Sequence, residues 1–122
     1  MSESRRERGQ RMMSEAMGMP AFPPPDAYTE FTVDALFGDV WGRPGLSRKE
    51  RRWITLAIAG MTGALGAIEG HVRAALTSGD VTREEMLEFV IHFAHYGGWP
   101  LSTNLYSAMQ KAVAELDAAK KS

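Results

Sequence analysis

Residues that stop helices recur along this chain, and they constrain its fold more than any other feature. Helix-ending signals stand at Gly18, at the three prolines of residues 23–25, in WGRPGL at 41–46, at Gly79, and at Gly97 with Gly98. The segments between these stops never alternate apolar and polar residues for long, as half-buried strands do. The sequence therefore predicts an all-α fold, and it contains no internal repeat.

Six helices are expected between these stops. Ser2 or Ser4 caps the first, while Ser47 with Glu50, and Thr82 with Glu85, form capping boxes that open two others. Gly63 and Gly66 predict a further break or tight bend. The expected helices span residues 5–17, 27–41, 47–61, 67–78, 82–96 and 101–119.

The length and composition restrict the class of protein. A chain of 122 residues fits one domain, 1–122, in which residues 1–25 form an N-terminal helix and a proline-rich connector. There is no cysteine, which excludes disulfides, thiolate chemistry and cysteine-bound zinc. The formal charge of −1 and the glutamates inside both arginine clusters argue against nucleic acid as the main partner. No stretch has the length of a membrane span or the apolar core of a signal peptide, so we expect a cytoplasmic protein without a membrane partner.

The helix expected at residues 82–96 carries apolar side chains on two sides. Leu87 and Ile91 share one face, and Phe89 and Phe93 lie roughly opposite. A helix that is apolar on nearly all sides is normally buried. In a domain this small, burial on two sides predicts contact with another subunit and therefore a homo-oligomer.

His71 lies in an alanine- and glycine-rich segment, GAIEGHVRAAL, and two interpretations are open. It is either a hydrogen-bonded histidine at a helix contact, or a general acid that lines a pocket. Glu69 lies two positions away and so faces a different side of the helix, where Arg73 is its more natural partner.

His92 and His95 share one helix face at a spacing of three residues, which permits a shared ligand. His-x-x-His is a weak metal signal by itself, and a third ligand would have to come from Glu88 or His71. Glu88 and His92 also have the spacing of an ordinary intrahelical pair. We therefore assign no metal site, and a metal-dependent protein built on His71, His92 and His95 stays an alternative.

Several stretches taken together resemble a known family. FGDVWGRPGLSRKERRWITLAIAG, then GHVRAALTSGDVTREEM, then IHFAHYGGWPLSTNLYSAM, resemble the carboxymuconolactone decarboxylase family, and the N-terminal ERGQRMMSEAMG is similar to the start of those decarboxylases. The similarity covers nearly the whole chain in the same order.

The resemblance implies an all-helical bundle shared with the alkylhydroperoxidase D group and assembled into trimers or hexamers. It also implies a carboxy-lyase that uses no cofactor and converts 4-carboxymuconolactone to the 3-oxoadipate enol-lactone, in the β-ketoadipate pathway of aromatic degradation. The thiol peroxidases of that group carry Cys-x-x-Cys-x-x-x-His. His71 matches the histidine, but Ala64 and Ala67 occupy the cysteine positions and Arg52 lies near that of the relay glutamate. Thiol peroxidase activity is therefore excluded.

The resemblance also points to candidate site residues. These are His71, His92 and Tyr96 as catalytic groups, and Arg43, Arg52, Trp99 and Asn104 as substrate-binding groups. His71 is expected to return a proton to the substrate. His92 or Tyr96 is expected to donate a hydrogen bond to the substrate carbonyl. Arg43 or Arg52 is expected to hold its second carboxylate. Gly66 and Ala67 stand where relatives commonly carry acids, and His95 and Trp99 where smaller residues are common, which indicates a reshaped pocket.

Two functions follow from these residues. The first is decarboxylation of 4-carboxymuconolactone or a related small carboxylated lactone. The second is a family member that binds a small molecule without catalysis, or that has another specialisation, because Trp99 is bulky and Gly66 and Ala67 replace the acids.

Overall fold

The computed structural model describes residues 2–121, and within them it contains helices and no strand. The chain divides into two compact units, Met1–Arg48 and Lys49–Ser122. The all-α prediction is confirmed. The assignment of all 122 residues to one domain stays a prediction. No helix within residues 2–121 has both the length and the apolar character needed to cross a membrane.

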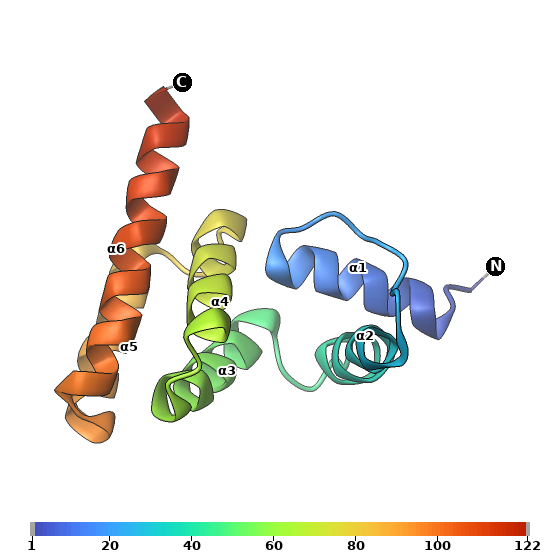
Figure 1. Ribbon diagram of the computed structural model, residues 1–122, viewed down its shortest axis with the longest axis horizontal. Coiled ribbons are helices and arrows are strands. Elements are labelled where there is room, and N and C mark those ends of the chain that lie inside the picture. The colour runs from blue at the N-terminus through green and yellow to red at the C-terminus, as the bar shows by residue number, and fades with distance from the viewer. Residues whose placement is uncertain (1, 122) are drawn as a thin grey trace. The chain divides into compact units, whose positions relative to one another are not determined.

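The first unit contains α1 (Arg5–Met17), α2 (Ala27–Phe31) and the π-helical segment η1 (Thr32–Trp41), which continues α2 directly (Figure 1). The predicted bounds of residues 5–17 and 27–41 are confirmed, but the π-helical winding of the second half was not foreseen. Ser4 and Glu7 form a capping box at the start of α1. Asp26 caps α2 by accepting a hydrogen bond from the Thr29 N–H at 2.8 Å.

The connector after α1 is part of this unit. Figure 1 shows it running back alongside α1 before α2 begins. Phe22 packs against the small core formed by α1 and η1, and its carbonyl accepts a hydrogen bond from the Gln10 side chain at 3.0 Å. That core consists of Met13, Ala16, Val33, Phe37 and Trp41. The N-terminal helix α1 therefore packs against η1, which lies beyond the connector in the sequence.

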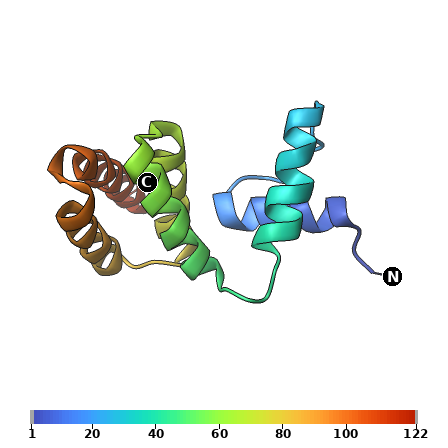
Figure 2. The same cartoon turned by 90° about the horizontal axis from the view of Figure 1, so that it is seen from below.

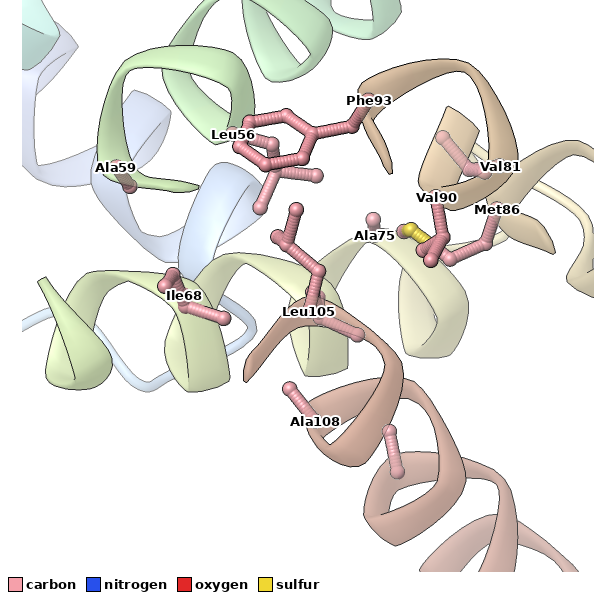
Figure 3. Close-up of a cluster of buried hydrophobic side chains, with 12 residues drawn as sticks. Leu56, Ala59, Ile68, Ala75, Val81, Met86, Val90, Phe93, Leu105 and Ala108 are labelled. Atoms are coloured by element: carbon pink, nitrogen blue, oxygen red, sulfur yellow. The ribbon is translucent and has the colours of Figure 1, made fainter. Parts of the chain in front are cut away.

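The second unit contains α4 (Leu65–Ser78), α5 (Arg83–Gly97), α6 (Trp99–Lys121) and all of α3 (Arg48–Thr62) except its first residue. The α5 and α6 helices lie side by side in both views, and α6 also packs on α4 (Figures 1 and 2). Leu56, Phe93 and Leu105, from three different helices, meet in the middle of the core (Figure 3). The capping box of Thr82 and Glu85 opens α5 as predicted.

Two predicted boundaries in this unit were wrong. The break between α3 and α4 is at Gly63, whose φ of 69° favours glycine, whereas Gly66 lies inside α4. The α4 helix therefore begins two residues earlier than predicted. The α6 helix begins at Trp99, because Pro100 is accepted in a first helical turn, where its missing N–H has no helical partner.

Gly9 permits α1 and η1 to pack closely, and this generates a stability prediction. A Cβ at Gly9 would lie 2.0 Å from the Val33 carbonyl oxygen, so Gly9→Ala must push the two helices apart. We expect a loss of about 3 kcal/mol in the free energy of unfolding. Urea unfolding followed by circular dichroism, with amide exchange in α1, measures it.

Gly45→Ala is the matched control, because a Cβ at Gly45 meets no heavy atom within 4 Å. The control should unfold like the unmodified protein. Equal stability of both variants would contradict the close approach.

Candidate active site

His71 lies in the middle of α4 and contacts Arg52 of α3. The Arg52 Nη1 atom is 2.9 Å from the His71 Nδ1 atom. Only 8% of His71 and 0% of Arg52 remain exposed. A guanidinium has donors and no acceptor, so Nδ1 accepts this hydrogen bond and the imidazole proton of the neutral ring is on Nε2.

Asp80 completes this buried group from the loop between α4 and α5. Its Oδ2 atom accepts a hydrogen bond from Arg52 Nη2 at 3.1 Å. The carboxylate compensates the charge of the arginine, which is necessary because an uncompensated buried charge is costly. Asp80, Arg52 and His71 therefore form one chain of polar contacts, which we call the Asp80–Arg52–His71 chain.

The surroundings of His71 favour its neutral form. Burial, and then the positive charge of Arg52, lower the pKa of His71 to about 4. At neutral pH the ring is therefore an uncharged donor through Nε2–H. The contact with Arg52 agrees with the first sequence interpretation, a hydrogen-bonded histidine at a helix contact, and the second, a general acid that lines a pocket, stays a prediction.

A second candidate region is a hollow of about 700 Å³ along α5. Its lining comprises Trp53, Glu84, Glu85, Glu88, Phe89, Ile91, His92, His95 and Tyr96. A smaller hollow of about 250 Å³ shares Phe89, His92 and Tyr96 with it. We refer to the larger one as the α5 hollow. Its volume lies in the range of small-molecule sites.

Aromatic contacts order the walls of the α5 hollow. The rings of His92 and Tyr96 stack with centroids 5.1 Å apart, and those of Trp53 and Phe89 stack at 5.0 Å. The His95 Nδ1 atom lies 2.8 Å from the Ile91 carbonyl oxygen, to which it donates when protonated. The hollow thus offers imidazole and phenol groups at the end where α5 finishes.

Carboxylates line the other end of the hollow, where α5 begins. Glu84, Glu85 and Glu88 belong to the first two turns of that helix. Glu85 forms an ion pair with Lys49, and this contact, followed by the Thr82 backbone N–H, lowers the pKa of Glu85. An anionic ligand would be repelled at this end and accepted more readily beside His92.

Comparison with known proteins places these groups in a family. The family model described as "Carboxymuconolactone decarboxylase family" matches residues 26–111. This chain is 35% identical over 75 residues to a 4-carboxymuconolactone decarboxylase of Acinetobacter baylyi, a match that covers 62% of this chain and 55% of that protein. It is 34% identical over 87 residues to the nitrosuccinic acid decarboxylase npaB of Metarhizium robertsii, covering 71% and 60%.

The chain belongs to the carboxymuconolactone decarboxylase family. It spans little more than half the length of the two curated relatives. The resemblance inferred from the motifs is therefore confirmed, and the roles of individual residues stay predictions.

The candidate residues of this family member fall into separate groups. His71 and Arg52 are in contact, and His92 and Tyr96 are in contact. His71 is not part of the lining of the α5 hollow, although Trp53, the neighbour of Arg52, is. Successive helical residues point about 100° apart, so α3 presents Arg52 and Trp53 to different sides.

The remaining candidates are more scattered. Arg43 follows η1 in the first unit. Trp99 is largely exposed and its ring contacts that of His95 edge-on, with centroids 5.2 Å apart. Asn104 is half-buried on α6.

The sequence analysis missed Asp80, for which the short SGD turn after α4 was a signal. Within residues 2–121, no three His, Asp or Glu side chains lie close enough together to hold a metal ion.

The low pKa of His71 predicts how stability depends on pH. The unfolded chain, in which histidine has its ordinary pKa near 6.5, binds a proton that the folded protein does not take up until about pH 4. The contribution of His71 to the free energy of unfolding is therefore fully present above pH 6.5. It decreases by on the order of 3 kcal/mol as the pH falls toward 4.

Urea unfolding at pH 7 and at pH 4.5 tests this. His71→Gln should reduce the loss of stability between these two values, since glutamine does not titrate. His95→Gln, at an exposed position, should keep the full loss. The same dependence in His71→Gln as in the unmodified protein would show that His71 is not the responsible group.

Proposed function

We propose that this protein is a cofactor-independent carboxy-lyase that removes carbon dioxide from 4-carboxymuconolactone or a related small carboxylated lactone. The buried contact between Arg52 and His71 is the observation that carries this proposal. The names of the two curated relatives support it, because both are called decarboxylases of small carboxylic acids.

The chemistry requires stabilisation of negative charge. When the bond to the carboxylate carbon breaks, its electron pair is delocalised through the ring double bond onto the lactone carbonyl oxygen, and carbon dioxide leaves. A donor that points at this oxygen lowers the barrier. We propose that the Nε2–H of His71 is this donor, and that the Arg52 contact on the opposite ring nitrogen orients the ring.

The reaction ends when a ring carbon takes up a proton. For 4-carboxymuconolactone this is the carbon next to the lactone carbonyl, because the carbon that lost the carboxylate becomes part of the ring double bond of the enol-lactone. We propose that His71 supplies the proton as a neutral imidazole rather than as an imidazolium. The charge of Arg52 favours loss of a proton from the ring, because it stabilises the negative charge that the imidazole would acquire. The proton is then restored from water.

His92 and Tyr96 would bind the substrate, and we propose that a second copy of the chain brings them to His71. Large apolar side chains lie exposed on α3, on α5 and at the start of α6, namely Ile54, Ile58, Leu87, Ile91 and Trp99. Apolar patches of this kind are covered in most soluble proteins. A homo-oligomer, as a trimer or hexamer, would cover them.

Non-catalytic binding of a small molecule is the alternative function. The aromatic walls of the α5 hollow and its acidic end favour it, because neither requires a reaction. Turnover of a carboxylated lactone separates the two functions directly.

Replacement of His71 tests the catalytic role. His71→Gln preserves an acceptor for Arg52 but has no comparable acid, so we expect turnover of 4-carboxymuconolactone to fall about 10²–10⁴-fold. Turnover is followed by absorbance, and circular dichroism checks that the variant is folded. His71→Ala should lose turnover likewise, and Asp117→Asn, which changes only a surface ion pair with Arg83, should not. A His71→Gln variant as fast as the unmodified protein would contradict the role.

Mixed oligomers test whether two copies share a site. His71→Gln and His92→Ala should each lose turnover alone, the latter about tenfold or more. Co-expression with different tags yields mixed oligomers, in which some sites combine an intact His71 with an intact His92. Their turnover should exceed that of either parent. Mixed oligomers no faster than their parents would show that each site is formed by one chain.

A further inference from the structure

The loop between α4 and α5 carries Asp80, and residues 79–81 of this loop are each fixed by backbone conformation, a hydrogen bond or packing. Gly79 ends α4 with a φ of 82°, a conformation that favours glycine. The Asp80 N–H donates to Ser78 Oγ at 3.2 Å, and the Val81 N–H donates to the Ala75 carbonyl at 3.3 Å. The Val81 side chain is buried in the core. The backbone of Asp80 is therefore fixed from both sides.

The side chain of Asp80 uses this fixed position to contact Arg52. Its exposed fraction is 10%, against 0% for the Arg52 side chain, so the pair is shielded from water. A guanidinium is planar and rigid. When Asp80 holds Nη2, it also restricts the direction of Nη1, which is the atom that donates to His71.

We propose that Asp80 is a positioning residue that acts through Arg52 to keep the proton of His71 on Nε2. Its consequence for turnover rests on the proposed function, whereas its consequence for the ring of His71 rests on the contacts alone. No family motif quoted from the sequence assigns a role to Asp80, and it need not touch the substrate.

The two tautomers of a neutral histidine differ in which nitrogen donates, and the partner of the other nitrogen selects between them. Without Asp80, the Arg52 guanidinium loses the contact that holds Nη2, so Nη1 is held less firmly against Nδ1 and the other tautomer gains population. Molecules with the proton on Nδ1 have no donor at Nε2. The catalytic rate constant should then fall at least in proportion to the population that is lost.

Nitrogen NMR of the full chain, labelled with ¹⁵N in histidine, reads this directly. In the unmodified protein at pH 7, the His71 ring should show an unprotonated Nδ1 and a protonated Nε2. Asp80→Ala should show a substantial or averaged population of the other tautomer. In the same variant kcat should fall on the order of tenfold, with a smaller change in KM.

Asp80→Asn is the second variant, because it keeps the size of the side chain and an acceptor oxygen but removes the charge. Its tautomer population and its kcat should both lie between those of Asp80→Ala and the unmodified protein. If Asp80→Ala does not fold, Asp80→Asn takes its place in the test. Asp117→Asn is the matched control, since Asp117 pairs with Arg83 at 2.6 Å on the surface. It should leave the His71 ring and kcat unchanged.

The outcomes separate this inference from the proposed function. A folded Asp80 variant whose His71 ring keeps the tautomer of the unmodified protein overturns the positioning role, whatever its activity. An unmodified protein that turns over no carboxylated lactone overturns the proposed function, while the NMR comparison still decides the role of Asp80. A tautomer change without any change in kcat overturns the catalytic part of the inference.

Discussion

The second unit depends on one buried cation. The Arg52 guanidinium lies where apolar helices meet, and a charge in that position is stable only when it is compensated and hydrogen-bonded. Asp80 supplies the compensating charge and His71 a neutral acceptor. The three side chains come from α3, from α4 and from the loop that follows α4. The same contacts therefore join the helices and keep the imidazole neutral.

This arrangement explains why the histidine is uncharged. A carboxylate directly beside His71 would stabilise the imidazolium, whereas Arg52 does the opposite and burial acts in the same direction. The order of the chain, with the arginine between the acid and the histidine, thus decides which chemistry is open to the ring. It favours stabilisation of an oxyanion by a neutral donor over acid catalysis by an imidazolium.

Local signals in the sequence were sufficient for most helix ends and insufficient for the site. Capping boxes and Gly18 or Gly79 act within a few residues, so the bounds of α1 and the start of α5 could be predicted. Gly66 was misleading because a glycine is tolerated within a helix at a modest cost. The π-helical winding of η1 has no short sequence signal.

The Asp80–Arg52–His71 chain could not be predicted by the same means. Arg52 precedes His71 by 19 positions and Asp80 by 28, so the contacts depend on how α3 packs against α4 and its loop. The family resemblance brought His71 and Arg52 to attention as separate candidates. Their contact, and the resulting change in the form of the histidine, required coordinates.

Electrostatics also distinguishes the two candidate regions. The α5 hollow has three glutamates at one end, one of which pairs with Lys49, so an anionic ligand would be repelled there more than beside His92 and Tyr96. The Asp80–Arg52–His71 chain carries no net charge when His71 is neutral, because the arginine and the aspartate cancel. A carboxylate beside His71 would therefore meet little attraction and a poorly solvated setting, which disfavours its charged form. In the proposed function, loss of carbon dioxide removes that charge, so these poorly solvated and neutral surroundings would favour decarboxylation more than binding.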